Sequence, residues 1–163
     1  MNHPGDEERT FCFNRSHLPV LAESEVAVIG GSFGGVTAAL TLARSGRQIT
    51  VIEPRTYLGR EVSATLRPWV LVPERVPVPE RVPVPERGTP LPEIVAACVE
   101  AGGTSVKHGE IPLHMDAVKV RLEDKLLDAG VNVIYASLPV GLVVEDNRLR
   151  GVIVGNKSGR QIV

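Results

Sequence analysis

A glycine-rich turn and an acidic residue at a fixed distance after it are the residues of this sequence best suited to chemistry. The turn reads Gly30, Gly31, Ser32, Phe33, Gly34 and Gly35, and Glu53 lies 23 positions after the first glycine. An apolar run precedes the turn, a helical pattern follows it, and a β-branched run leads to the acid. This is the spacing of a strand-turn-helix-strand unit that binds a dinucleotide.

Each part of the unit has a physical task. Gly30 permits the tight turn out of the strand, the third position lets the backbone approach a pyrophosphate, and Gly35 lets the helix pack against the strand. Ser32 occupies that third position, and its hydroxyl can donate to a phosphate oxygen. The free N–H groups and dipole at the start of the helix favour the phosphates. Glu53 can accept hydrogen bonds from both ribose hydroxyls of an adenosine and would repel a 2′-phosphate.

The elements that must position these residues follow from the hydrophobic pattern. The sequence predicts a strand at Val26–Ile29, a helix at Val36–Ala43 and a strand at Ile49–Ile52. Beyond them it predicts short helices at Arg60–Leu66 and Leu91–Ala101, a helix at Asp116–Ala129 with Asp116 as N-cap, and a strand at Val131–Ala136. A meander of three strands is expected last, at Val140–Val144, Leu149–Val154 and Gln161–Val163.

Two segments, VAVIGGSFGGVTAAL and VIEPRTYLGREVSAT, resemble the FAD-dependent oxidoreductases of the glutathione-reductase-like flavoprotein superfamily. In that family a Leu-Gly-Gly-x-x-Thr type segment wraps the pyrophosphate and the ribityl chain. The resemblance assigns this role, together with Glu53, to the following residues: Pro54, Arg55, Leu58, Gly59, Arg60 and Ser63. Arg60 stands where the family usually has a second glycine. The resemblance also places the region of Val140 at the adenine edge.

The resemblance implies an α/β fold, a Rossmann-like three-layer FAD/NAD(P)-binding fold with a parallel sheet covered by an antiparallel β-meander. We expect it to be C-terminally incomplete, because the family's next strand, which returns to the parallel sheet, would follow Val163. We expect residues 1–24 to form a flexible tail and residues 25–163 to form the FAD-binding domain. A proline-rich inserted loop at 70–90, with two copies of Val-Pro-Val-Pro-Glu-Arg, would interrupt that domain.

Composition narrows the classes of partner. The chain has 163 residues, 43% of them hydrophobic, and a formal net charge of −1, so it offers no basic field to nucleic acid or to an anionic membrane. Its two cysteines, Cys12 and Cys98, form no C-x-x-C pair, and a reducing cytoplasm is the simplest compartment. His108 and His114 are six residues apart, a spacing that does not favour a metal site. We therefore expect no metal.

The first functional hypothesis is the FAD-binding portion of a flavin-dependent oxidoreductase that acts on an unknown small-molecule substrate. Two alternatives stay open, a non-catalytic nucleotide-binding remnant and an NAD-linked dehydrogenase module. The segment from Leu58 to Ser63 and the closing meander favour FAD over NAD. No catalytic residue can be assigned, because the flavin itself carries the hydride chemistry in such enzymes. An oligomer is possible.

Overall fold

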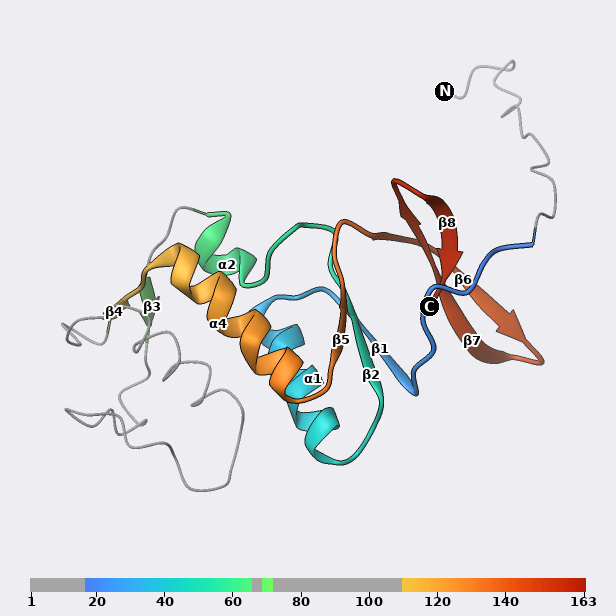
Figure 1. The fold of residues 1–163 in the computed structure, drawn as a ribbon, viewed down its shortest axis with the longest axis horizontal. Coiled ribbons are helices and arrows are strands. Elements are labelled where there is room, and N and C mark those ends of the chain that lie inside the picture. The colour runs from blue at the N-terminus through green and yellow to red at the C-terminus, as the bar shows by residue number, and fades with distance from the viewer. Residues whose placement is uncertain (1–16, 66–68, 72–109) are drawn as a thin grey trace, which may run out of the picture.

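Three parallel strands form the centre of the fold in the order β1-β2-β5 (Figure 1). A computed structural model describes residues 17–65, 69–71 and 110–163. The strands are β1 (Val26–Ile29), β2 (Ile49–Ile52) and β5 (Asn132–Ile134). β1 pairs with β2 from Val26 opposite Ile49 to Ile29 opposite Ile52, so both strands end at the same level. The glycine turn and Glu53 therefore leave the sheet side by side at its carboxyl edge.

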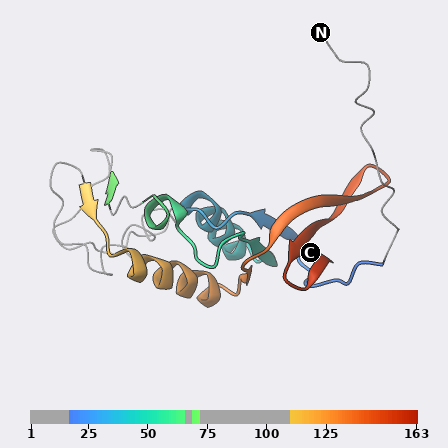
Figure 2. The same ribbon diagram turned by 90° about the horizontal axis from the view of Figure 1, so that it is seen from above.

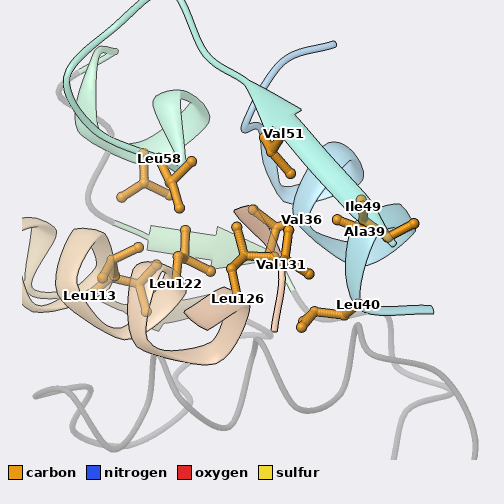
Figure 3. Close-up of a cluster of buried hydrophobic side chains, with 12 residues drawn as sticks. Val36, Ala39, Leu40, Ile49, Val51, Leu58, Leu113, Leu122, Leu126 and Val131 are labelled. Carbon is orange, nitrogen blue, oxygen red and sulfur yellow. The ribbon is translucent and has the colours of Figure 1, made fainter. Parts of the chain in front are cut away.

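Helices α1 (Phe33–Arg44) and α4 (Met115–Asp128) contribute to one hydrophobic core with β2 (Figures 1 and 3). Along α4 the buried side chains recur every four residues, which gives the helix one apolar face. Leu58, from the segment after β2, is also fully buried in this cluster. The core residues labelled in Figure 3 are Val36, Ala39, Leu40, Ile49, Val51, Leu58, Leu113, Leu122, Leu126 and Val131.

An antiparallel meander forms the third layer, on the other side of the central sheet from the helices (Figures 1 and 2). Its strands are β6 (Leu138–Glu145), β7 (Arg148–Asn156) and β8 (Gly159–Ile162). A second core cluster joins Ile52 of β2 to three residues on the meander side: Val152, Val154 and Val163. The expected Rossmann-like fold with a parallel sheet and a β-meander is confirmed.

The turn between β6 and β7 lies where the sequence predicted it. Asp146 and Asn147 adopt φ values of 49° and 58°, the left-handed pair that a two-residue hairpin turn needs. Asparagine and aspartate tolerate this region better than other non-glycine residues. The local turn chemistry therefore sets the register of the β6–β7 hairpin.

A second pair of strands was not foreseen from the sequence. β3 (Trp69–Leu71) pairs antiparallel with β4 (Glu110–Pro112). The two strands lie at the two ends of the stretch 72–109, which is outside the described residues. That stretch contains most of the expected proline-rich loop and the whole helix predicted at Leu91–Ala101. The last two residues of β3, Val70 and Leu71, occupy the first positions of the range predicted for the loop.

The three described helices differ from the predicted ranges in one or both bounds. α1 begins at Phe33, inside the glycine motif, and not at Val36. α2 (Arg60–Ser63) ends before the predicted Leu66, which is outside the described residues. The N-cap of α4 is His114 and not Asp116: the imidazole Nδ1 of His114 accepts the N–H of Ala117 at 3.4 Å, while Asp116 pairs with Lys119 on the first turn.

The chain before β1 also makes described contacts. The N–H of Leu21 donates to the carbonyl of Ile162, and the N–H of Ile162 donates to the carbonyl of Pro19. Residues 19–21 therefore extend the edge of the meander, although they lie inside the segment expected to be a tail. No helix among the described residues is long and apolar enough to cross a membrane.

Candidate functional site

The glycine turn has the close geometry that its sequence predicts. Gly30 adopts a φ of 98°, which L-residues with side chains rarely adopt. A Cβ atom added at Gly35 would lie 1.9 Å from the carbonyl oxygen of Gly30, so only glycine lets α1 begin this close to the end of β1. Ser32 is the N-cap of α1, and its Oγ accepts the N–H of Gly35 at 3.2 Å. Its own O–H stays available as a donor.

Glu53 is held against the turn. Its side chain is 2% exposed, and its Oε2 accepts the N–H of Gly31 at 2.6 Å. Its Oε1 accepts the N–H of Arg55 at 2.8 Å, and the Arg55 guanidinium lies 3.8 Å from the same oxygen. The acid predicted from spacing therefore touches the glycine motif directly, and backbone donors fix its orientation.

The segment after β2 folds back over the turn. The N–H of Gly59 donates to the carbonyl of Gly31 at 2.9 Å, and a φ of 69° at Gly59 starts α2. Among the described residues, the buried Oγ of Ser63 has no hydrogen-bond partner. Arg60 and Pro54 are exposed. The segment thus folds over the glycine turn at Gly59, and the leucine before it is packed into the core. That this segment wraps a pyrophosphate and a ribityl chain stays a prediction.

Glu61 is a residue at this site that sequence reasoning missed. Its carboxylate accepts the N–H of Phe33, the first residue of α1, at 3.3 Å. Glu61 lies in the first turn of α2 and is exposed. The sequence shows an acidic residue two positions after the Leu58-Gly59 pair. Its contact with Phe33 follows only from the way the segment with α2 folds back toward the start of α1.

The connection from β5 to the meander forms another wall of the site. The N–H of Ala136 donates to the carbonyl of Arg55 at 3.0 Å, and the N–H of Ser137 donates to the carbonyl of Glu53 at 3.2 Å. Burial, followed by the nearby Glu123 and Glu53, raises the pKa of Tyr135 above its usual range. The sequence predicted a strand through Ala136 but not the contact of this segment with Glu53 and Arg55.

Val140, the residue predicted at the adenine edge, lies farther along in β6. It is half-exposed and sits where the β6–β7 register shifts, between the pairs that Pro139 and Gly141 form. The described hydrogen bonds link Ala136 and Ser137, and not Val140, to the segment Glu53–Arg55. The role of Val140 stays a prediction.

These groups suit a dinucleotide. Each oxygen of the Glu53 carboxylate accepts one N–H and has a second lone pair free for a hydroxyl. The N-terminal end of α1 attracts an anion, and the buried Ser63 hydroxyl lacks a partner within the described part of the chain. No group of three His, Cys, Asp or Glu side chains suited to a metal ion occurs in residues 17–65, 69–71 and 110–163.

Comparison with known proteins places these features in context. The sequence is 36% identical over 72 residues to the bacilliredoxin reductase Bdr of Bacillus subtilis (strain 168), a match that covers 44% of this chain and 21% of that protein. The fold is similar to THI4 of Thermovibrio ammonificans, with a TM-score of 0.56, 16% identity, and coverage of 86% of this chain and 54% of that one.

A second similar structure is the myxobacterial halogenase CndH, described as a variant of FAD-dependent halogenases. Its TM-score is 0.55 at 17% identity, over 83% of this chain and 34% of that one. The chain thus spans about a fifth of its curated relative and about half of the THI4 structure.

The sequence model of a flavoenzyme family matches the whole α/β unit. The match begins just before β1 and runs through the meander to the last residue, and it therefore includes the glycine turn, Glu53 and the segment that folds over them. It covers residues 25–163 and is described as FAD dependent oxidoreductase. This chain belongs to the FAD-dependent oxidoreductase family, whose cofactor is FAD.

Proposed function

We propose that this chain binds FAD at the glycine turn and serves as the cofactor-binding part of an oxidoreductase that acts on a small molecule. The observation that carries the proposal is the hydrogen bond from the N–H of Gly31 to the buried carboxylate of Glu53, at 2.6 Å. It joins the pyrophosphate turn and the ribose acid into one rigid site. Such preorganisation lowers the ordering cost of binding.

Each part of the site would hold one part of the cofactor. The N-terminal end of α1 and the Ser32 hydroxyl would contact the pyrophosphate, and the free lone pairs of Glu53 would accept the ribose hydroxyls. The unpartnered hydroxyl of Ser63 would supply a further hydrogen bond. When bound, FAD supplies the redox chemistry, and the protein supplies its position and electrostatic surroundings.

Glu53 also argues for a nucleotide without a 2′-phosphate. A phosphate on the ribose would bring negative charge next to a carboxylate that is 2% exposed and poorly screened by solvent. We therefore propose that NADP is excluded. A cytoplasmic location belongs to the same proposal and is supported by the two cysteines without a C-x-x-C pair. The small-molecule substrate is proposed from the family alone.

Ligand titration of the purified chain tests the proposal. FAD should bind with one molecule per chain, and NAD should bind at least tenfold more weakly. Glu53→Gln should weaken FAD by about 1.5–3 kcal/mol, because hydrogen bonds to a charged acceptor are lost. Glu145→Gln is the matched control, because Glu145 lies at the β6–β7 turn and its variant changes the net charge equally. Tighter binding of NAD than of FAD would favour the NAD-linked alternative.

A further inference from the structure

Two carboxylates contact backbone N–H groups of the same glycine motif, and they differ in how firmly they are held. Glu53 reaches Gly31 at 2.6 Å, is almost fully buried and accepts a second N–H from Arg55. Glu61 reaches Phe33 at 3.3 Å from the exposed side of a four-residue helix. The first carboxylate is part of the frame of the site, whereas the second can rotate into solvent.

The position of Glu61 is the one that the proposed cofactor needs. Phe33 is the first residue of α1, and the N–H groups there carry the positive end of the helix dipole. A pyrophosphate and the Glu61 carboxylate would use the same donor, and their negative charges would repel each other at contact distance. Both cannot occupy that end of the helix.

We propose that Glu61 is an internal anion that occupies the phosphate-facing end of α1 in the empty protein and must leave before FAD binds. This inference rests on the proposed function, because it concerns the same site. Glu61 stabilises the empty state and thereby weakens FAD. Any contact that draws Glu61 away from the N–H of Phe33 would tighten the cofactor, which makes this residue a point of control over cofactor affinity.

The test compares FAD affinity and thermal stability in wild type, Glu61→Gln and Glu61→Ala. Removing a charge from a helix N-terminus should strengthen FAD about twofold to fivefold at low salt. The gain should shrink in concentrated salt, because exposed charges are screened. Without FAD the same variants should melt at a lower temperature, and with saturating FAD they should melt like wild type. Glu145→Gln is again the matched control for net charge.

The predicted gain in FAD affinity together with the loss of stability in the empty protein separates this role of Glu61 from a purely structural one. If Glu61 only caps α1, its substitution should lower thermal stability both with and without FAD and should leave FAD affinity unchanged or weaker. That result would overturn the inference while leaving FAD binding intact. Glu61→Gln keeps the shape of the side chain, so it serves if Glu61→Ala folds poorly. Absence of FAD binding in wild type and in every variant would overturn the proposed function and this inference with it.

Discussion

Glu53 has one task that the structure shows and one that we propose. It is a buried carboxylate that satisfies backbone donors of the glycine turn, and it is the acid that the dinucleotide motif requires. The spacing in the sequence predicts the second task. The first depends on the parallel pairing of β1 and β2, which brings residues 22 apart into contact.

Substitution of Glu53 should therefore cost stability even without cofactor. Glu53→Gln puts an amide NH₂ where one of two backbone N–H groups needs an acceptor, and a buried donor is left unpaired. The free energy of unfolding should fall by about 1–3 kcal/mol. Urea denaturation of the cofactor-free protein measures this change, and an unchanged midpoint would contradict the buried geometry.

Tyr135 should make the protein sensitive to alkali. Burial chiefly, and then Glu123, raises the pKa of its phenol above the ordinary value of 10.0. The stability that this neutral phenol confers is present below pH 10 and falls as the pH rises above it, because only the unfolded chain then releases the proton. Tyr135→Phe should flatten the decline of stability above about pH 10. An equally steep decline in the variant would contradict this prediction.

At the scale of elements, α1 shows what a motif can and cannot predict. The glycine pattern correctly predicts a helix after β1, but hydrophobic periodicity alone places its start three residues late, at Val36. The helix begins at Phe33 because Ser32 caps it and because Gly34 and Gly35, which are weak helix formers, are held by the turn. For α4, the imidazole of His114 supplies the cap, a role that residue-type preferences assign to the nearby Asp116.

The two glycines in the first turn of α1 offer a matched pair of substitutions. Gly35→Ala would place a Cβ 1.9 Å from the carbonyl oxygen of Gly30, so α1 must move off the strand. Gly34→Ala meets only the Oγ of Ser32 at 3.7 Å, an ordinary contact.

We expect Gly35→Ala to lower stability by more than about 3 kcal/mol, the scale of severe overpacking. Gly34→Ala should be neutral or should stabilise by up to about 1 kcal/mol, because alanine favours a helix over glycine. Thermal unfolding of both variants measures the contrast. Equal effects would show that α1 does not begin as tightly against β1 as the structure has it.

At the scale of the whole molecule, local sequence signals predicted most of the elements but not the long-range pairing of strands. The central strands, α1, α4 and the meander follow from periodicity and turn residues, and the layer order follows from the family resemblance. The pairing of β3 with β4 could not be predicted, because the two short strands lie on either side of a stretch of 38 residues, 72–109, and neither has a period of its own. The contact of Glu61 with Phe33 could not be predicted either, because it depends on how α2 packs against α1.

The strand pair β3–β4 bears on the proline-rich repeat. Because Leu71 and Glu110 are partners in adjacent strands, a connection shorter than 72–109 can still link them. Deleting Val76–Arg87 should change the cost of closing the loop by well under about 1 kcal/mol. The melting temperature should stay nearly constant, and a large loss of folded structure would mean that the repeat packs against the domain.

The central claim is that FAD binds at the glycine turn beside Glu53, and amide chemical shifts during a titration test it most directly. In a ¹⁵N-labelled chain, adding FAD should shift the resonances of Gly31, Phe33 and Gly59 in a saturable way. The resonances of Asp146 and Asn147, at the β6–β7 turn on the meander, should stay in place. Saturable shifts confined to the meander, or no saturable shifts in a folded chain, would contradict the account.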